Sequence, residues 1–426
     1  MELPVIFPEL KGQRYDCEHC GQGCRELVVF LTERDRKKID RQKWTGRLDR
    51  APYIRFSGGY VLNHQPNGDC VFLSPDNLCR IHAEFGYTEK PLSCQLYPFT
   101  LEPEGEGFRV SVRFDCPAIA KSVGSPLTAH RPDVARLAGA FQAAELPELA
   151  PPSTPVELMP DRPLTNAELD GLVAQLDAWV RDGTRPLRER LAGLHDLVET
   201  LAAAKLGKVR DADFIGLVEM LVTDLPNVAA EARSLPPPAP RQRKLFAHAV
   251  FAHCENVRFE EACLGLFGRL AYRFDQLGRA RRLASGVGEI PRLVRGLAGG
   301  TFEQVEQVRR DETLTAEECE AMLTRYLRAR IVGRTAFGHG FYGWPVLDGL
   351  RALLLAIAVI GWVTRYVAVG AGRTTFARAD LVRALGVVDR NATRSPELGS
   401  RSARLRLRYL TPEQGILRLL GAYPLE

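Results

Sequence analysis

The pattern of hydrophobic and polar residues near the N-terminus is that of short strands and loops. The segment FRVSVRFDC, residues 108–116, alternates strictly between apolar and polar positions, which predicts a half-buried strand. We expect it to pair with LYPFTL across the turn PEGEG. ELVVFLT, residues 26–32, predicts another strand, and Thr32 with Asp35 forms the capping box of a helix that starts ERDRKKID.

Beyond residue 163 the apolar positions repeat with the period of a helix. Capping boxes or cap residues predict helix starts, and apolar residues on one helical face follow the one at Thr165. The predicted starts are Thr165 with Glu168 and Thr315 with Glu318, and Thr411 followed by Pro412 and Gln414 predicts a last one. Leu187, Leu191, Leu194, Val198 and Leu201 indicate one more helix.

One apolar run, ALLLAIAVIGWVT at residues 352–364, is shorter than the ~20 residues that a bilayer needs. Arg351 and Arg365 bracket it, so we predict a buried core helix and no membrane association. The Pro-rich stretch APPSTPVELMPDRP, residues 150–163, predicts a connector. Together these patterns predict an α+β protein: a cysteine-cluster metal-binding domain over 1–125, a Pro-rich connector over 126–163 and a mainly helical domain over 164–426.

Composition narrows the class of protein. The chain has 426 residues, 45% of them apolar, and 57 Lys and Arg against 52 Asp and Glu give a net charge of +5. Nearly balanced charge gives no strong field for polyanions, so no nucleic-acid partner is expected. The first ten residues lack the basic and apolar regions of a signal peptide, and we predict a cytoplasmic protein. No βαβ series or dinucleotide fingerprint is visible, which argues against a Rossmann-type methyltransferase.

The cysteines are concentrated near the N-terminus. Seven of ten lie before residue 117: Cys17, Cys20, Cys24, Cys70, Cys79, Cys94 and Cys116. The cytosol keeps thiols reduced, so disulfides are not the expected explanation. Closely spaced thiols are soft ligands that suit zinc or an iron–sulfur cluster. Cys254, Cys263 and Cys319 lie within helical patterns and are predicted to be packing residues.

Four separated segments carry a resemblance to a known family. In chain order they are CEHCGQGCR, GDCVFLSPDNLCRIH, KPLSCQLYPF and RFDCP. They resemble the YkgJ-type cysteine-cluster family, described as zinc- or iron-chelating domains, whose members show C-x2-C-G-x-C-C-R and P-x2-C-R-x-[FY]-P-F. The resemblance covers about the first 120 residues. It implies that the seven N-terminal cysteines occupy seven of the family's eight cysteine positions.

The sequence departs from the family pattern at two positions. Gly23 stands where the family has a cysteine, and Gln95 stands where an arginine is frequent. A histidine could replace the missing ligand, and the candidates are His19, His64 and His82. His82 is the best placed, since it follows Cys79 by three residues.

Overall similarity to flagellin lysine N-methylase implies a more specific function. That resemblance implies a [4Fe–4S] cluster used together with S-adenosylmethionine, and flagellin-like lysines of a protein substrate as the partner. The alternative is a zinc-thiolate module that is purely structural, joined to a helical domain that binds a partner protein. Nothing in the residues separates the two.

Overall fold

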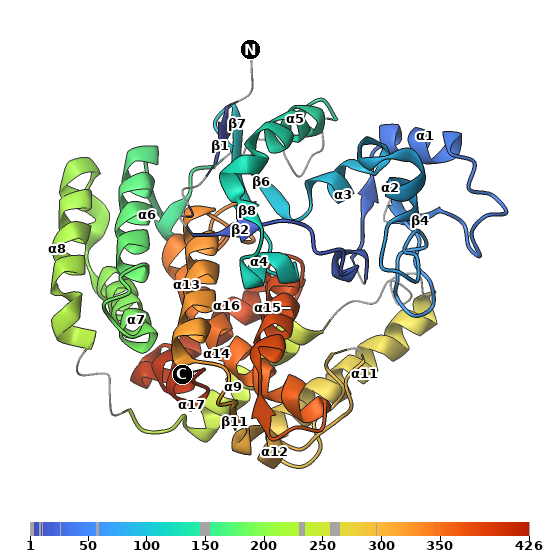
Figure 1. Cartoon of the computed structure of the whole chain (residues 1–426). Helices are drawn as coiled ribbons and strands as arrows, with labels where there is room; N and C mark the ends of the chain where they lie inside the picture. Colours follow the sequence, from blue (N-terminus) through green and yellow to red (C-terminus); the bar gives the residue numbers. More distant parts are fainter. Residues whose placement is uncertain are drawn as a thin grey trace. The chain divides into compact units, whose positions relative to one another are not determined.

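The computed structural model describes residues 4–7, 10, 12–25, 27–56, 59–144, 154–229, 235–255, 265–294 and 296–425. The chain forms two compact units (Figure 1). The N-terminal unit comprises Met1–Pro151 with Val257–Asp275, and the helical unit comprises Pro152–Asn256 with Gln276–Glu426. The domain boundaries at 125 and 163 stay predictions. Within 126–163 the structure contains helix α5 (Arg131–Gln142) and the hairpin of β9 (Glu157–Met159) and β10 (Arg162–Pro163).

The described residues of the N-terminal unit form three small sheets. They have the order β1 (Val5–Ile6), β7 (Gly107–Val112), β6 (Phe99–Glu104); β3 (Phe30–Leu31), β5 (Gly59–Leu62), β4 (Tyr53–Phe56); and β2 (Arg14–Tyr15), β8 (Ser125–Pro126). Among the described residues of this unit, β1 pairs with β7 in parallel and the other pairs are antiparallel. The sheets are too small to form a layer of their own, so their connecting loops make up much of the unit.

Short helices complete the N-terminal unit. Besides α5 they are α1 (Glu33–Arg41), α2 (Arg80–Phe85), α3 (Leu92–Leu96), α4 (Pro117–Lys121) and the 3-10 turns η1 (Gln22–Cys24), η2 (Tyr87–Glu89) and η3 (Leu127–His130). A hydrophobic cluster joins α1, β5 and α2 through Ile39, Leu62, Phe72 and Ile81, with the Trp44 and Phe72 rings in edge contact at 5.1 Å. This cluster gives the loops a fixed surface to pack against.

The predicted hairpin and first capping box are confirmed. β6 pairs antiparallel with β7 in a register that sets Phe99 opposite Val112, and Thr32 and Asp35 exchange both capping bonds at the start of α1. The predicted strand over 26–32 is reduced to β3. The alternation predicted a half-buried strand, but the polar side chains of β7 are buried as well. Arg109 on this side pairs with Glu104, and β1 pairs with the outer edge of β7.

The helical unit is built almost entirely of helices. They are α6 (Asn166–Val180), α7 (Leu187–Ala203), α8 (Asp211–Ala229), α9 (Pro240–Cys254), α11 (Leu266–Ser285, from Gln276 on), α12 (Phe302–Gln307), α13 (Ala316–Val332), α14 (Val346–Gly370), α15 (Arg378–Ala392), α16 (Arg401–Leu410), α17 (Gly415–Ala422) and two 3-10 turns, η5 (Leu206–Lys208) and η7 (Pro412–Gln414). A short parallel pair links β11 (Arg309–Arg310) to β12 (Thr375–Phe376).

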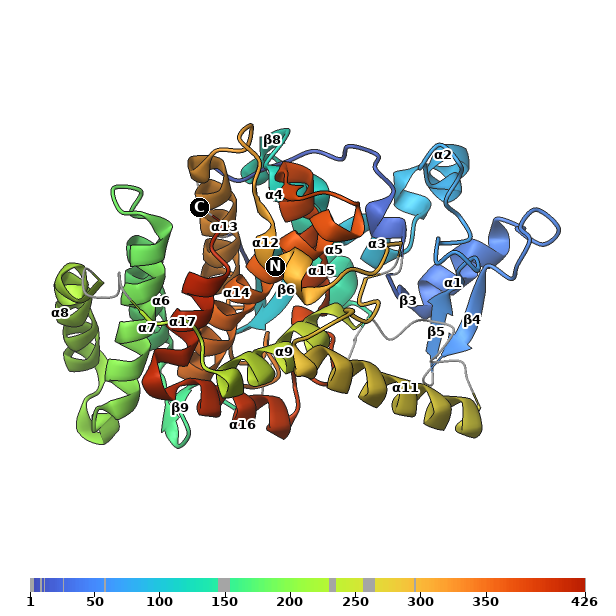
Figure 2. The ribbon, with the colours of Figure 1, turned by 90° about the horizontal axis from the view of Figure 1, so that it is seen from below.

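Helix α14 forms the centre of the helical unit. Helices α7, α9, α15 and α17 pack around it (Figures 1 and 2), and its most apolar window, long enough to span a membrane, is 94% buried within the protein. This burial confirms the predicted core helix. Arg351 of α14 is satisfied by Glu199 at 2.8 Å and Asp348 at 3.1 Å.

The other predicted helix starts have two outcomes. The capping boxes of Thr165 with Glu168 and of Thr315 with Glu318 are confirmed at the starts of α6 and α13. The start at Thr411 is wrong: Gln414 adopts a left-handed conformation, so residues 412–414 form a separate 3-10 turn and α17 begins at Gly415.

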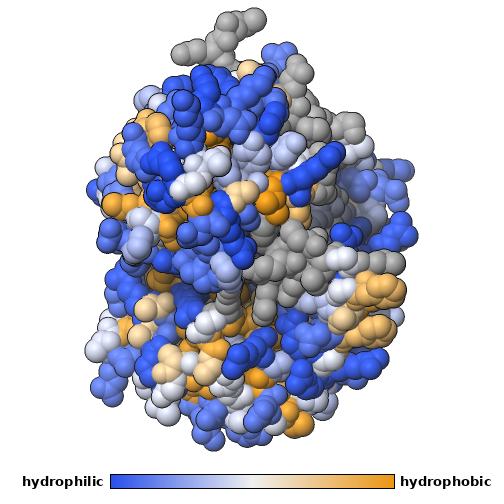
Figure 3. All heavy atoms as spheres, turned by 90° about the vertical axis from the view of Figure 1, so that its right-hand side faces the viewer, coloured by the Kyte–Doolittle hydropathy of each residue, from blue (hydrophilic) through white to orange (hydrophobic). Residues whose placement is uncertain are grey.

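The described surface mixes polar and apolar residues. Figure 3 shows hydrophobic residues scattered among hydrophilic ones on one face of the molecule. The most exposed large apolar side chains, Phe267 at 85% and Phe274 at 71%, lie on α11. Positions seven residues apart fall on nearly the same side of a helix, so α11 exposes an apolar stripe.

Candidate metal centre

The first cysteine loop is a tight turn that follows β2. Gly21 adopts a left-handed conformation with φ of 68°, and the Cys24 amide donates to the Gly21 carbonyl at 2.9 Å to close the 3-10 turn η1. Glycine takes this conformation without steric cost. The turn places Cys17 and Cys20 on the exposed side of the loop and leaves Cys24 half-buried.

Arg25 joins this turn to two other loops. Its guanidinium donates to the Cys20 carbonyl at 3.0 Å, to Asp69 Oδ1 at 3.2 Å and to Asn77 Oδ1 at 2.5 Å. Asp69 directly precedes Cys70, and Asn77 lies two residues before Cys79. A single planar side chain with five donors is well suited to hold three segments at once.

Cys70, Cys79 and Cys94 come from three different elements and pack against the same hydrophobic cluster. Cys79 is the N-terminal cap residue of α2, Cys94 lies within α3, and the Cys70 amide donates to the Cys24 carbonyl at 2.8 Å. These contacts bring Cys24 and the other three half-buried cysteines into one neighbourhood.

Three thiols of this neighbourhood, Cys24, Cys70 and Cys94, have raised pKa values, first because they are buried and then because other thiols lie nearby. Burial raises the pKa of Cys24 to about 11, with further contributions from the charge of Cys79 and then of Cys17 and Cys20. Burial likewise raises the pKa values of Cys70 and Cys94, and each also responds to the charges of Cys24 and Cys79. Neutral thiols are therefore favoured until a cation offsets the repulsion between thiolates.

Cys116 lies beside the start of the first cysteine loop. Cys116 is the N-cap residue of α4. The segment that leads to Cys17 is bonded to this helix, since the Gln13 side-chain amide donates to the Ile119 carbonyl at 2.8 Å. It is also bonded to the turn after the helix, where the Asp16 backbone amide donates to the Val123 carbonyl at 3.0 Å. Burial raises the pKa of Cys116 to about 12, and the charge of Cys20 contributes to the rise.

The three candidate histidines have different surroundings. His64 is buried, and its Nε2 lies 3.1 Å from the Leu27 carbonyl oxygen, a bond that leaves it as a structural residue of the core. His82 is exposed and makes an edge contact with the Tyr87 ring at 5.9 Å. Burial lowers the pKa of His82, and the charges of Lys90 and His19 lower it further.

All nine described cysteines are free thiols. Among the residues that the structure describes, no three His, Cys, Asp or Glu side chains already adopt metal-binding geometry. Binding therefore requires thiol side chains to turn toward one another on the backbone frame described above. Cys254 and Cys319 are buried packing residues, as predicted; Cys263 lies outside the described residues.

A family model matches the segment of the chain that contains the cysteine loops. Residues 16–117 match the CxxCxxCC family model. Its description is "Putative zinc- or iron-chelating domain". The CxxCxxCC segment, residues 16–117, contains all seven N-terminal cysteines. The donor set fits such a metal, since soft thiolates are preferred ligands of zinc and of iron–sulfur clusters.

One curated relative aligns with part of the chain. Uncharacterized protein MJ0939 of Methanocaldococcus jannaschii is 32% identical over 109 residues, which cover 25% of this chain and 36% of that protein. No solved structure matches the chain. The similarity to flagellin lysine N-methylase therefore stays a prediction.

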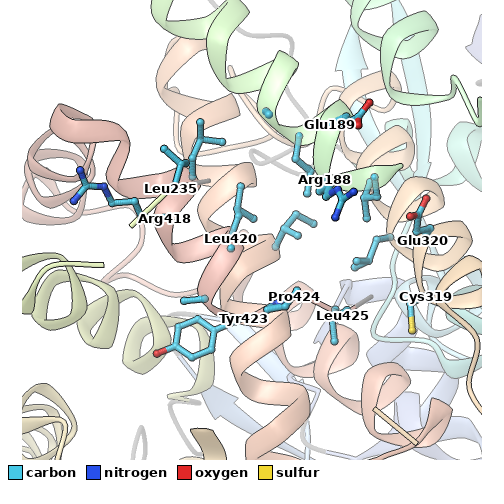
Figure 4. A pocket seen from close by; sticks show the side chains of 18 of the residues that line it. Arg188, Glu189, Leu235, Cys319, Glu320, Arg418, Leu420, Tyr423, Pro424 and Leu425 are labelled. Carbon is cyan, nitrogen blue, oxygen red and sulfur yellow. The ribbon is translucent and has the colours of Figure 1, made fainter. Parts of the chain in front are cut away.

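The helical unit contains a pocket of about 570 Å³ (Figure 4). Its lining is mainly aliphatic, and the C-terminal residues Tyr423, Pro424 and Leu425 form one wall. Among its charged lining residues, Glu320 pairs with Arg190 at 2.9 Å, and Glu306 pairs with Arg243, which also lines the pocket, at 3.5 Å. The pocket therefore combines a mainly aliphatic surface with ion-paired side chains.

Sequence reasoning missed the residues that hold the loops together. Arg25 follows the last cysteine of the first segment, and Asp69 precedes Cys70. Their positions next to cysteines could have marked both residues as candidates. The bond between them joins residues 44 positions apart in the chain, so only the folded structure reveals it.

Proposed function

We propose that the protein is a thiolate metalloprotein whose N-terminal unit binds zinc or an iron–sulfur cluster through its cysteines. The observation that carries the proposal is the neighbourhood of Cys24, Cys70, Cys79 and Cys94, which come from four separate segments. The match of residues 16–117 to a zinc- or iron-chelating family supports it. The packing of three of these cysteines against one hydrophobic cluster supports it as well.

The chemistry of the four thiols fits a metal centre. Their mutual repulsion and burial disfavour thiolates without a cation, and a bound cation reverses that balance, as in other sites where metal binding releases protons. Four thiolates close a tetrahedral site around zinc or hold the four irons of a [4Fe–4S] cluster. The metal would supply either structural cross-linking or electron transfer.

The decisive experiment measures metal and sulfide in the full chain purified without oxygen. We expect stoichiometric zinc in a colourless protein, or iron with sulfide in a brown one. Cys24→Ser, Cys70→Ser, Cys79→Ser and Cys94→Ser should each lower the metal content. The matched control is the double variant Cys254→Ser with Cys319→Ser, which alters two buried cysteines of the helical unit. Metal content far below one equivalent, or equal in all variants, would contradict the proposal.

Catalysis is a separate and finer proposal. S-adenosylmethionine-dependent lysine methylation, a flagellin-like substrate and a cytoplasmic location rest on the resemblance and on the sequence. The supporting measurement is calorimetric titration of the metal-loaded protein with S-adenosylmethionine. Absence of binding would favour the structural zinc module with a partner-binding helical domain.

A further inference from the structure

Positive charge is concentrated on two neighbouring helices of the helical unit. Helices α9 and α16 pack against each other, and Figure 2 shows them side by side. Together they contain seven Arg and Lys residues and no Asp or Glu. The near balance of charge over the whole chain, the ground for expecting no nucleic-acid partner, therefore does not hold here. The surface that we call the α9–α16 face consists of Arg241, Lys244 and His248 on α9 and Arg401, Leu405, Arg406 and Tyr409 on α16.

The residues of α9 in this face lie opposite the buried side of the helix. Arg241, Lys244 and His248 are three and four positions apart, a spacing that puts them on one side of a helix. Phe246 is buried on the other side, whereas Arg241 and Lys244 are exposed. Burial lowers the pKa of His248, and the charges of Arg406 and Lys244 lower it further. His248 is therefore uncharged at neutral pH, and the charge of the face comes from its Arg and Lys residues.

Helix α16 adds an exposed aromatic ring beside these cations. Arg401, Leu405 and Tyr409 follow one another at intervals of four positions, so they lie along one side of the helix. Leu405 is 52% exposed and Tyr409 is 51% exposed. The Arg241 guanidinium lies 5.0 Å from the centroid of the Tyr409 ring. This contact joins the two helices into one surface of mixed cationic and aromatic character.

Four of the seven cations have no carboxylate to neutralise them. Arg243 of α9 pairs with Glu306 at 3.5 Å. Arg404 and Arg408 of α16 lie 2.6 Å and 3.6 Å from Asp348. Over the part of the chain that the structure describes, the cations of the two helices without an ion-pair partner are Arg241, Lys244, Arg401 and Arg406. Unpaired charges of one sign on one surface attract a polyanion.

The layout of the α9–α16 face favours an extended chain of phosphates with bases. At a rise of 1.5 Å per residue, Arg401 and Arg406 are about 7.5 Å apart along α16, which suits successive phosphates better than a single ion. The exposed ring of Tyr409 is the kind of surface on which single-stranded bases stack. Leu405 is the only aliphatic side chain of the face, too little apolar surface for insertion into a bilayer. Two helices side by side also differ from the single helix that enters the major groove of a duplex.

We propose that the α9–α16 face binds single-stranded nucleic acid. Its four unpaired cations contact phosphates, and Tyr409 stacks on a base. This binding goes beyond the proposed metal-binding function and does not rest on it. Contacts to phosphates carry no sequence information, so the face tolerates many sequences. RNA and DNA share this chemistry, and the choice of probe separates them.

The test measures fluorescence anisotropy of labelled oligo(dT) and oligo(U) titrated with the full chain at several salt concentrations. For single strands the logarithm of the association constant falls with the logarithm of the salt concentration by about 0.7 for each phosphate contacted, so four cations predict a slope of about −3. The double variants Arg241→Met with Lys244→Met, and Arg401→Met with Arg406→Met, should each reduce this slope to about half. Lys208→Met is the control, because it alters an exposed cation on turn η5 and should leave the slope unchanged.

The aromatic contact is tested separately from the charges. Tyr409→Leu should weaken binding roughly 5- to 100-fold at an unchanged salt slope, and Tyr409→Phe, which keeps the ring, should bind nearly as well as the wild type. Absence of binding at low salt, or an equal change of slope in Lys208→Met, would overturn the proposal.

Two other polyanions provide competing outcomes. Equal affinity for poly-glutamate, with no effect of Tyr409→Leu, would assign the face to an acidic protein partner. Binding to phosphatidylserine vesicles but to neither oligonucleotide would assign it to a membrane surface. Either result overturns the proposal. All of these measurements follow the nucleic acid or its competitors and not the metal, so their failure leaves the proposed metal-binding function in place.

Discussion

Replacing Arg25 by methionine should weaken metal binding without removing any ligand. Its guanidinium makes three hydrogen bonds, to the loops of Cys20, Cys70 and Cys79. Each hydrogen bond contributes roughly 0.5–1.5 kcal/mol. Because the Arg25 side chain is 34% exposed, we take the lower half of that range and expect the free energy of metal binding to weaken by about 2 kcal/mol. Such a loss corresponds to about a 30-fold rise in the metal dissociation constant, within the roughly 10–100-fold range for residues that orient ligands.

The assay is competition for Zn²⁺ between the protein and a chromophoric chelator. Arg25→Lys keeps the charge but offers one ammonium in place of a planar fork, so it should recover little of the affinity. Arg36→Met is the control, because among the described residues the partners of Arg36, namely Glu33, Asp40, Tyr53 and Tyr60, lie on α1, β4 and β5 and on none of the cysteine loops. An Arg25→Met dissociation constant within threefold of the wild type would refute the clamp, as would equal losses in both methionine variants.

Three further outcomes are expected in urea and acid unfolding. Glu168→Gln should cost about 3–5 kcal/mol, because it breaks a buried pair with Arg162. Hydrogen bonds from Arg162 lower the pKa of the Glu168 carboxyl to about 2. The ionised carboxylate therefore stabilises the wild-type fold above about pH 4.5, and this contribution is lost as the pH falls toward 2. Glu168→Gln lacks the carboxylate and should not show this part of the pH dependence. Gly23→Ala should lower the free energy of unfolding by about 1–3 kcal/mol, because the added Cβ would lie 2.6 Å from the Tyr97 ring. Adding Tyr97→Leu removes the ring and should restore part of that free energy. Gly361→Ala should cost a similar amount, since its Cβ would lie 2.1 Å from a carbonyl oxygen of the C-terminal segment.

Gly421→Ala is the control for Gly361. Gly421 is also helical, but nothing lies within 4 Å of its added Cβ, so alanine should stabilise the helix by up to about 1 kcal/mol. Equal midpoints for the two alanine variants would show that the close approach at Gly361 is relieved at no cost.

Local signals in the sequence were sufficient for part of the fold. The capping boxes at Thr32, Thr165 and Thr315 define helix starts because both halves of each bond lie within four residues. The start at Thr411 failed because the backbone beyond it turns left-handed, which no residue type there signals. Short strands such as β3 depend on pairing with distant partners, and periodicity overestimates their length.

For the candidate site, the sequence named seven cysteines as candidate metal ligands but could not say how they are grouped in the fold. Cysteine spacing within CEHCGQGCR suggested that Cys17, Cys20 and Cys24 act together. The structure adds a backbone bond from the Cys70 amide to the Cys24 carbonyl, and a second one from the Asp16 amide, next to Cys17, to the Val123 carbonyl after α4. Spacing along the chain sets the distance between neighbours, whereas grouping depends on contacts between segments that are far apart in sequence.

The differing exposure of the cysteines has a consequence for chemical damage. Cys17 and Cys20 face solvent, whereas Cys116 is buried and Cys70, Cys79 and Cys94 sit against packed aromatic and aliphatic side chains. A dissolved oxidant or alkylating reagent meets the first two sulfurs without any opening of the fold, but it needs local unfolding to reach Cys116. Oxidation or alkylation should therefore begin at Cys17 and Cys20 and reach Cys116 last.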